Sequence, residues 1–432
     1  MKICILAAGA GGMYCGSCMR DNALASALLR AGHQVTLIPL FTPMKTDTPS
    51  VSGGKVFLGG INIYLQHASK LFRRTPRFFD WLLDRNWLLN LAGKLGTSKP
   101  YSEMGGLTLD LLQGEDGGIV KEVRRLADFI QRDIQPQVVT LPNLMFMGAA
   151  SVFHKELKIP VVCELTGEDI FLDVLEEPYR TQVRDAIRQR VQFVSKFVAT
   201  SHYYADQMAD YLGIPREQID VVYPGLPREF LSSLPTQNTA RNGRPPTVGY
   251  LARICPEKGF ERLVDAMILL RQMPGMSGVQ LRCGGYLGKR DRKFFDQLQQ
   301  RVESSPLKGA MTYVGEVDQA GKIELLSSID VFSAPSIYPE SKGIYVLEAL
   351  SLGVPVVQPA HGSFPELLKK TGGGVLTVPG DAAALARALA EMLQDEPRRT
   401  ACGEGARRIV HEEFTDTRMA EQMLKIYQEA RV

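Results

Sequence analysis

The sequence predicts an α/β protein built from two doubly wound parallel sheets, and three observations support this. Short apolar runs of strand length alternate with helical patterns along the whole chain, as is typical of βαβ units and hence of parallel strands. A polar, proline-containing stretch at 226–246 interrupts this alternation once. The length of 432 residues suits two or three domains at about 150 residues each.

The composition is that of a globular protein with balanced charge. Hydrophobic residues make up 45% and charged residues 22% of the chain, which excludes a disordered chain, a coiled coil and a fibre. Lys and Arg number 50 against 47 Asp and Glu, a formal net charge of +3. Nucleic-acid-binding proteins usually show a larger or more clustered basic excess. We therefore expect no nucleic-acid partner.

The cysteines and the apolar segments predict a reduced, cytoplasmic protein. The seven cysteines are odd in number and scattered, which does not fit a disulfide framework. Glycines interrupt the apolar run that begins the chain, before the core of a signal peptide could form. No stretch of 18 apolar residues occurs, so we also expect no membrane-spanning helix.

The first half of the chain predicts one Rossmann-like domain over residues 1–228. Its expected strands lie at 2–8, 34–40, 137–141, 160–165, 197–201 and 219–225. Its expected helices lie at 21–33, 119–133, 145–157, 177–194 and 202–212. Prolines, polar residues and the lack of periodicity then predict a linker over 229–245.

The second half restarts the same alternation and predicts a second Rossmann-like domain over 246–415. Its expected strands lie at 247–252, 279–285, 311–315, 330–336, 354–359 and 374–378. Its expected helices lie at 259–273, 342–353 and 391–396, with a last helix at 416–432. Open parallel sheets bind ligands beyond the carboxyl ends of their strands. We therefore expect the two domains to face each other across a ligand-binding cleft.

A glycine-rich loop follows the first strand at Gly9, Gly11 and Gly12. Glycines before a helix allow the backbone to approach a phosphate. However, Tyr14 occupies the third glycine position of a dinucleotide fingerprint, and the second strand offers no acidic residue for a ribose. This makes an NAD-dependent oxidoreductase the least favoured class. The loop is either a tight turn without a ligand or a ligand-proximal loop of another kind.

Two cations follow the first strand of the second domain. Arg253 and Lys258 lie five residues apart, just before Gly259 and the next helix. Arginine can bind a phosphate through two nitrogens and lysine as a point charge. The pair therefore suits a diphosphate, although a solvated charge pair with Glu257 or Glu261 explains the same residues.

Two carboxylates flank the start of a later helix. Glu340 follows the strand at 330–336, and Glu348 lies eight residues further on, inside the helix that Gly343 helps to open. The free N–H groups of a helix N-terminus favour a phosphate. Glu340 could bind sugar hydroxyls and Glu348 a ribose, although paired glutamates on a helix are usually only surface residues.

These motifs together resemble the retaining glycosyltransferases of family 4. They are the glycine-rich loop, R-x4-K-G at 253–259, E-x7-E at 340–348 and A-x3-G-x-P-V-V at 349–357. The resemblance implies the GT-B fold, with two Rossmann-like domains around a cleft. It implies a metal-independent hexosyltransferase without a cofactor, whose donor is a nucleotide-diphosphate sugar and whose acceptor is unknown. It also implies that the helix at 416–432 packs on the N-terminal domain.

The same resemblance assigns roles to individual residues. Arg253 and Lys258 should contact the donor diphosphate, Glu340 the transferred sugar and Glu348 the ribose. The donor site should be completed by backbone N–H groups near Gly343, Ile344 and Tyr345. Gly11 and Gly12 should line the cleft from the N-terminal domain.

One departure from the family concerns Thr166. Such enzymes usually carry His-Gly after the strand at 160–165, whereas this chain has Thr166 followed by Gly167, Glu168 and Asp169. Thr166 occupies the position of the histidine that hydrogen-bonds the donor sugar. We expect Thr166 to bind substrate, and either Thr166, Glu168 or Asp169 orients the sugar and the acceptor or the site binds a donor without transferring it. A non-catalytic sugar-nucleotide-binding protein and a sugar-nucleotide epimerase on the same fold remain alternatives.

Two further features lie outside this scheme. Cys15 and Cys18 form a single C-x-x-C before a helix, which cannot complete a four-ligand zinc site by itself. These thiols are either structural or sensitive to oxidation. The segment 70–95 is basic and apolar and contains both tryptophans. It forms either a peripheral contact with an anionic membrane or, in the reading we favour, a pair of core helices.

Overall fold

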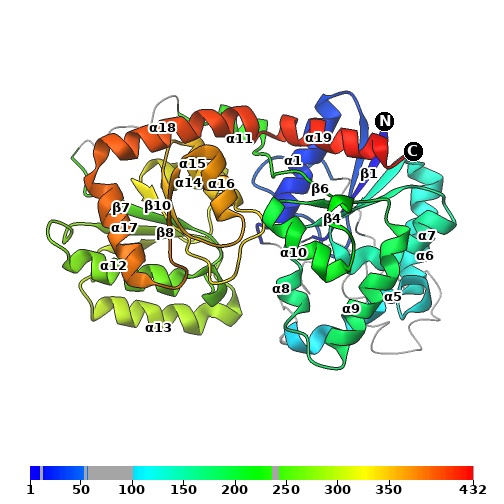
Figure 1. The fold of residues 1–432 in the computed structure, drawn as a ribbon, viewed down its shortest axis with the longest axis horizontal. Helices are drawn as coiled ribbons and strands as arrows, with labels where there is room; N and C mark the ends of the chain where they lie inside the picture. The colour runs from blue at the N-terminus through cyan, green and yellow to red at the C-terminus, as the bar shows by residue number, and fades with distance from the viewer. Residues whose placement is uncertain (10–12, 53–55, 57–100, 236–242, 432) are drawn as a thin grey trace. The chain divides into compact units, whose positions relative to one another are not determined.

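The computed structural model describes residues 1–9, 13–52, 56, 101–235 and 243–431 (Figure 1). These residues form two compact units. Unit 1 comprises Met1–Gly225 and Asp416–Val432, and unit 2 comprises Leu226–Thr415. Gly11, Gly12 and the segment 70–95 lie outside the described residues, so the predictions made for them stay predictions.

Unit 1 contains a six-stranded sheet in the order β2-β1-β3-β4-β5-β6, with every neighbouring pair parallel. Its strands are β1 (Lys2–Ala7), β2 (Gln34–Pro39), β3 (Val138–Leu141), β4 (Val161–Leu165), β5 (Lys196–Ala199) and β6 (Ile219–Val221). All six lie where the apolar runs predicted them. The order reverses between β1 and β3, which makes the carboxyl ends of these strands the switch point of the sheet.

Both faces of this sheet are covered, as a parallel sheet requires. Ile3 and Ile5 of β1 belong to one apolar cluster, and Cys4 and Leu6 belong to another. Alternate residues of a strand point to opposite faces, so the two clusters lie on opposite sides of the sheet. The helices are α1 (Gly16–Arg30), α5 (Gly105–Gln113), α6 (Val120–Phe129), α7 (Ala150–Lys155), α8 (Asp169–Leu172), α9 (Tyr179–Arg190), α10 (His202–Leu212) and α19 (Asp416–Glu429).

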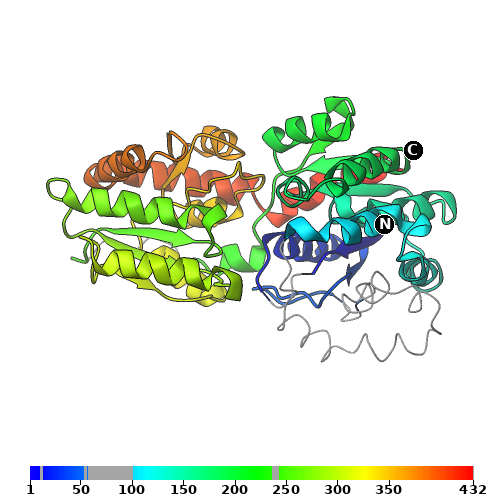
Figure 2. The same ribbon diagram turned by 90° about the horizontal axis from the view of Figure 1, so that it is seen from below.

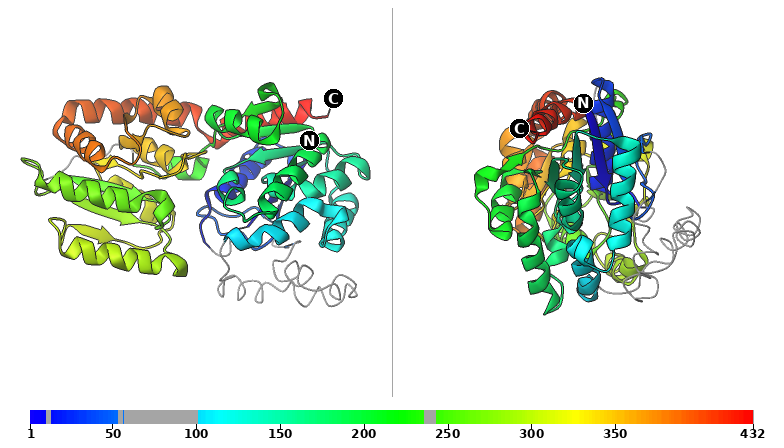
Figure 3. Two further views of the ribbon diagram at one scale, coloured as in Figure 1. Left: turned by 60° about the horizontal axis from the view of Figure 1, so that its bottom comes forward. Right: turned by 90° about the vertical axis from the view of Figure 1, so that its right-hand side faces the viewer.

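Helix α19 joins unit 1 although it ends the chain. It packs against α1, and Met423 and Tyr427 are buried in the same apolar cluster as Leu24. Arg30 of α1 also binds Asp416 across 2.6 Å. Both ends of the chain therefore lie on unit 1 (Figure 3).

Unit 2 contains a second parallel six-stranded sheet, in the order β12-β11-β10-β7-β8-β9. Its strands are β7 (Thr247–Leu251), β8 (Gln280–Gly284), β9 (Met311–Tyr313), β10 (Val331–Phe332), β11 (Val356–Pro359) and β12 (Gly374–Thr377). Counted from β7, this is the 3-2-1-4-5-6 order of dinucleotide-binding sheets, and its switch point lies between β7 and β10. The fold class predicted from the alternating pattern is thus confirmed in both units.

The helices of unit 2 lie on either side of its sheet (Figure 2). They are α11 (Arg228–Ser232), α12 (Phe260–Gln272), α13 (Arg292–Glu303), α14 (Gln319–Ser327), α15 (Ile344–Ser351), α16 (Phe364–Thr371), α17 (Ala382–Gln394) and α18 (Glu396–Glu413). Three differences from the sequence analysis concern helices. Helices α5, α8, α13, α14 and α16 were not predicted, and α11 occupies part of the stretch predicted as a linker. The helical segment at 391–396 spans the end of α17 and the start of α18, because Asp395 caps α18 by accepting the Arg398 N–H.

Candidate active site

The loops that follow β7 and β10 meet at the switch point of unit 2. Gly259 has a φ of 70°, and a Cβ there would lie 1.7 Å from the Pro335 carbonyl oxygen. Only glycine fits this close approach. The Ile337 N–H also donates to the Glu257 carbonyl across 2.9 Å. The R-x4-K-G segment is therefore held against the segment that leads to Glu340.

Lys258 and Glu340 form a buried ion pair at this point. The Lys258 ammonium donates to the Glu340 carboxylate across 2.5 Å, and the Tyr345 hydroxyl donates to the same oxygen across 3.1 Å. The ammonium also lies over the rings of Tyr338 and Tyr345, at 4.9 and 5.2 Å from their centroids. Glu340 is 5% exposed. The predicted phosphate cation and the predicted sugar-binding carboxylate are thus brought together.

The pair keeps both groups charged despite their burial. Burial raises the pKa of Glu340, but the Lys258 ammonium outweighs it and lowers that pKa to about 2. Burial acts to lower the pKa of Lys258, but the Glu340 carboxylate outweighs this effect, so the pKa of Lys258 is raised. Lys342 contributes to the lowered pKa of Glu340, so this lysine adds positive charge at the predicted donor site.

Helix α15 begins immediately beside the pair. Gly343 caps the helix with a φ of 65°, and a Cβ there would lie 2.6 Å from the Leu367 side chain. Ile344 and Tyr345 are the first two residues of the helix, so their N–H groups have no intrahelical partner. The partial positive charge of the helix N-terminus is thus added to that of Lys258 and Lys342.

A second glycine supports Glu340 from behind. Gly362 has a φ of 62°, and a Cβ there would lie 2.4 Å from the Glu340 nitrogen. The neighbouring Ser363 N–H donates to the Glu340 carbonyl across 2.7 Å. The loop after β11 therefore fixes the backbone of Glu340, a contact that sequence analysis did not predict.

Arg253 lies on the same loop as Lys258 but has different partners. Its Nε donates to the Cys255 sulfur at 3.3 Å, and Nη2 lies 3.9 Å from the Glu257 carboxylate. Its side chain is 32% exposed. The interpretation as a charge pair with Glu257 therefore accounts for part of the surroundings of Arg253, whereas Lys258 pairs with neither Glu257 nor Glu261 in the interactions that the structure describes.

Glu348 is buried rather than a surface residue of its helix. It is 7% exposed and accepts a hydrogen bond from Lys322 of α14 across 2.5 Å. The Lys322 ammonium in turn lies 5.5 Å from the ring centroid of Phe230. Sequence analysis missed Lys322 and Phe230. The helix α14 was not predicted, and Phe230 lies in the stretch predicted as a linker.

The carboxyl end of β4 in unit 1 holds a different arrangement around Thr166. The Thr166 hydroxyl donates to the Pro142 carbonyl at 3.3 Å, and its N–H donates to the Glu168 carboxylate at 2.7 Å. The other oxygen of Glu168 accepts the Leu144 N–H at 3.2 Å. Glu168 therefore connects the loop after β4 to the loop after β3, beyond the carboxyl ends of two neighbouring strands.

Glu168 has no described cation beside it, unlike Glu340. Burial raises the pKa of Glu168 to about 7, although hydrogen bonds from backbone N–H groups act to lower it. The nearby charge of Asp169 raises this pKa further. Burial also raises the pKa of Asp169, which accepts hydrogen bonds from Tyr204 and Gln207 across 2.7 Å each. Sequence analysis named both acids but did not predict these partners.

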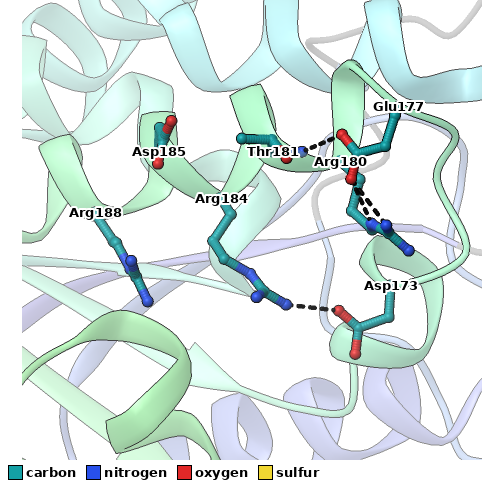
Figure 4. A pocket seen from close by; sticks show the side chains of 7 residues that line it. All are labelled: Asp173, Glu177, Arg180, Thr181, Arg184, Asp185 and Arg188. Atoms are coloured by element: carbon teal, nitrogen blue, oxygen red, sulfur yellow. Dashed lines mark hydrogen bonds and ion pairs between the residues drawn. The ribbon is translucent and has the colours of Figure 1, made fainter.

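A pocket of about 520 Å³ also lies on unit 1, between α9 and the segment after α8 (Figure 4). Its walls are Asp173, Glu177, Arg180, Thr181, Arg184, Asp185 and Arg188. Two of its arginines pair with its carboxylates, Arg184 with Asp173 at 3.1 Å and Arg180 with Glu177 at 2.8 Å. None of the site residues predicted from the sequence lines this pocket.

In the described part of the chain, no group of three or more His, Cys, Asp or Glu side chains could hold a metal ion. No helix among the described residues is long and apolar enough to span a membrane.

Two family models match the chain. The model for glycosyl transferases group 1 matches residues 236–409, and the model for glycosyltransferase family 4 matches residues 112–230. The chain is 34% identical over 187 residues to phosphatidyl-myo-inositol mannosyltransferase of Mycobacterium leprae, which is 42% of this chain and 46% of that protein. It is 23% identical over 271 residues to N-acetyl-alpha-D-glucosaminyl L-malate synthase of Bacillus anthracis, 62% of this chain and 68% of that protein. The chain thus spans about half the length of the curated mannosyltransferases it matches.

Solved structures resemble the chain over nearly its full length. HepE of Anabaena, solved with UDP and glucose, has a TM-score of 0.66 and 19% identity, covering 99% of each chain. Sucrose-phosphate synthase of Thermosynechococcus elongatus has a TM-score of 0.71 and 18% identity, covering 99% of this chain and 98% of that one. The fold is GT-B. The chain belongs to glycosyltransferase family 4.

Proposed function

We propose that this protein transfers a hexose from a nucleotide-diphosphate sugar to an acceptor, with retention at the anomeric carbon and without a metal ion. The observation that carries the proposal is the convergence of Lys258, Glu340 and the start of α15 at the switch point of unit 2. Positive charge from a lysine and a helix N-terminus beside a fixed carboxylate suits a diphosphate joined to a polyhydroxyl ring. Structures of HepE were solved with UDP and glucose and with UDP-glucose, which supports such a donor.

The chemistry follows from where charge develops. As the bond from the sugar to the diphosphate breaks, negative charge grows on the leaving phosphate. In the proposed scheme Lys258, Arg253 and the N–H groups of Ile344 and Tyr345 stabilise this charge. When the diphosphate engages Lys258, the Glu340 carboxylate exchanges that partner for hydroxyls of the transferred sugar. Departure and attack on the same face of the sugar retain the configuration without a covalent nucleophile.

Glu348 would bind the ribose of the donor in this scheme. A carboxylate can accept hydrogen bonds from both hydroxyls of a ribose. Lys322 holds one of its oxygens. The acceptor belongs to unit 1, and we propose that the glycine-rich loop with Gly11 and Gly12 contributes to binding it.

The relatives suggest which donors and acceptors to test first. Their names include a mannosyltransferase acting on phosphatidyl-myo-inositol and an N-acetylglucosaminyl L-malate synthase. Mannose, N-acetylglucosamine and glucose are therefore the first donor sugars to test, and inositol lipids and hydroxy acids the first acceptors. We propose a cytoplasmic location, because the seven cysteines are scattered rather than arranged as a disulfide framework.

The decisive experiment incubates the full chain with UDP-, GDP- and ADP-linked forms of these sugars, with and without acceptor. Release of the nucleoside diphosphate measures turnover, and NMR of the product anomeric proton reports the stereochemistry. We expect turnover with one donor class and retention in the product. NAD serves as the binding control, and no donor consumed under any condition would overturn the proposal.

Thr166 favours one alternative, a non-catalytic protein that binds sugar nucleotides. Its hydroxyl is engaged by the Pro142 carbonyl, so it does not replace the histidine of the family in an obvious way. Tight nucleotide binding without donor consumption would support this alternative. An epimerase would convert the donor sugar without attaching it to an acceptor, and the same product analysis identifies it.

A further inference from the structure

The C-x-x-C motif of unit 1 plays no part in the proposed sugar transfer. Cys15 is the N-cap of α1, with φ −122° and ψ 126°, and Cys18 is the third residue of that helix. The side chain of an N-cap residue lies over the first turn of the helix. Residues three positions apart lie on the same face of a helix, so the two thiols are neighbours, and the interaction with Cys15 contributes to the raised pKa of Cys18.

The two thiols differ in accessibility. Cys18 is 1% exposed, whereas Cys15 is only partly buried. Among the remaining cysteines, Cys402 alone is also partly exposed, and it lies in unit 2. A reagent from solution can therefore reach Cys15 first, with Cys18 directly behind it.

The surroundings of Cys15 favour attack by its sulfur. The N-terminus of α1 favours negative charge on a side chain placed there. Lys45 also lies close by, with its ammonium 4.1 Å from the ring centroid of the adjacent Tyr14. Cys18 has the opposite character, because its interaction with Cys15 and its burial both raise the pKa of its thiol.

We propose that Cys15 and Cys18 are a reversible dithiol site that low-molecular-weight disulfides oxidise to an intrachain disulfide. The reaction follows from the order in which the sulfurs can be reached. The Cys15 sulfur attacks one sulfur of the small disulfide, whose S–S bond breaks, and the first small thiol leaves with the proton of Cys15. The Cys18 sulfur then attacks Cys15, and the second small thiol leaves with the proton of Cys18. Two protein thiols are oxidised and one small disulfide is reduced.

The site is connected to the loop that follows β1. The backbone N–H of Gly9 acts to lower the pKa of the Cys18 thiol, against the larger effects that raise it. Gly9 has a φ of 81°, and a Cβ there would lie 2.3 Å from the Thr42 carbonyl oxygen. Oxidation of Cys18 therefore changes a group beside the start of the glycine-rich loop.

The test uses the reduced full chain and oxidised glutathione as the probe. After incubation, the chain is denatured, the remaining thiols are alkylated, and tryptic peptides are analysed by tandem mass spectrometry. The peptide ending at Arg20 also contains Cys4, so fragmentation is needed to assign the sulfurs. We expect Cys15 and Cys18 to lose alkylation together, Cys4 to remain alkylated, and dithiothreitol to restore both thiols.

Three variants make the test specific. Cys18→Ser should accumulate a mixed disulfide with glutathione on Cys15, because no second thiol resolves it. Cys15→Ser should leave Cys18 unreacted, and the control Cys402→Ser should form the Cys15–Cys18 disulfide as the wild type does. Wild-type chain that keeps both thiols, stops at the mixed disulfide or links Cys15 to Cys402 would overturn the proposal. None of these outcomes depends on sugar transfer.

Discussion

Each sheet holds a buried glutamate beyond the carboxyl end of one of its strands, β10 in unit 2 and β4 in unit 1, and the two glutamates are stabilised in different ways. Glu340 of unit 2 is paired with Lys258 across 2.5 Å, and its pKa is lowered to about 2. Glu168 of unit 1 is bound by two backbone N–H groups, and its pKa is raised to about 7. The two side chains are equally exposed, at 5% each.

The difference shows that burial alone does not decide the charge of a carboxylate. A neighbouring cation can offset the cost of removing the group from water, whereas uncharged donors offset only part of it. Glu340 therefore remains an anion throughout the physiological range, as its proposed role of binding sugar hydroxyls requires. Glu168 changes its charge within that range, which suits a residue that connects two loops.

The largest expected effect comes from removing the cation that distinguishes the two sites. Lys258→Ala should reduce turnover on the order of 10²-fold or more, because the leaving phosphate loses its positive partner. Initial rates of nucleoside diphosphate release measure this. Lys308→Ala removes an exposed lysine of the same unit and should leave the rate unchanged.

The same substitution also leaves Glu340 buried without its cation, so folding needs a separate measurement. Lys258→Arg keeps the charge and should retain more of the folded-state stability than Lys258→Ala. Thermal unfolding of both variants separates the loss of structure from the loss of catalysis. Wild-type turnover in Lys258→Ala would mean that the lysine only neutralises Glu340.

Glu348 tests whether a second paired carboxylate of unit 2 binds the donor. Glu348→Ala should weaken nucleoside diphosphate binding by about 1.5–3 kcal/mol, the value of a charge-assisted hydrogen bond. Titration calorimetry measures this, with Glu303→Ala as an exposed control in the same unit. An unchanged affinity would contradict the ribose assignment and leave Glu348 as a structural partner of Lys322.

The raised pKa of Glu168 predicts that the stability of the fold depends on pH with the opposite sign to that expected from a salt-bridged acid. This pKa is about 7 in the folded chain against an ordinary value of 4.5, so the folded state binds the proton more tightly than the unfolded state. The stabilising contribution of Glu168 to the free energy of unfolding is fully present below about pH 4.5 and is lost as the pH rises through 7. The free energy of unfolding should therefore fall on the order of 2 kcal/mol between pH 5 and pH 8 through this group.

Urea unfolding at a series of pH values compares the wild type with Glu168→Gln. The variant should be less stable at pH 5, because an amide N–H₂ replaces one of the two oxygens that accept backbone hydrogen bonds. The difference in the free energy of unfolding between the two proteins should become smaller towards pH 8, because Glu168 of the wild type ionises and the amide does not. Parallel curves would show that another group is responsible for the pH dependence.

Thr166 should produce the smallest effect. Thr166→Val removes the hydroxyl that donates to the Pro142 carbonyl and should cost roughly 1 kcal/mol of stability, with turnover retained. The comparison of urea unfolding and initial rates checks both statements. A large loss of turnover without a loss of stability would instead place the hydroxyl in contact with a substrate.

The sequence by itself determined the strands and the loops that hold the candidate residues. Buried parallel strands appear as continuous apolar runs, so all twelve strands of the described residues lie where these runs predicted them. Arg253, Lys258, Glu340 and Glu348 could be singled out because they follow such runs or open a helix. Helix α14 was not predicted, and with it the sequence analysis missed Lys322.

Only the tertiary structure decided which of these groups are partners. Lys258 and Glu340 are 82 residues apart and Lys322 and Glu348 are 26 apart, and no local pattern specifies either pair. The 3-2-1-4-5-6 order of the second sheet makes β7 and β10 neighbours, and this brings the loops after them together. Strand order is set by packing of the whole sheet, so the charge of Glu340 and that of Glu168 could be assigned only once their neighbours were known.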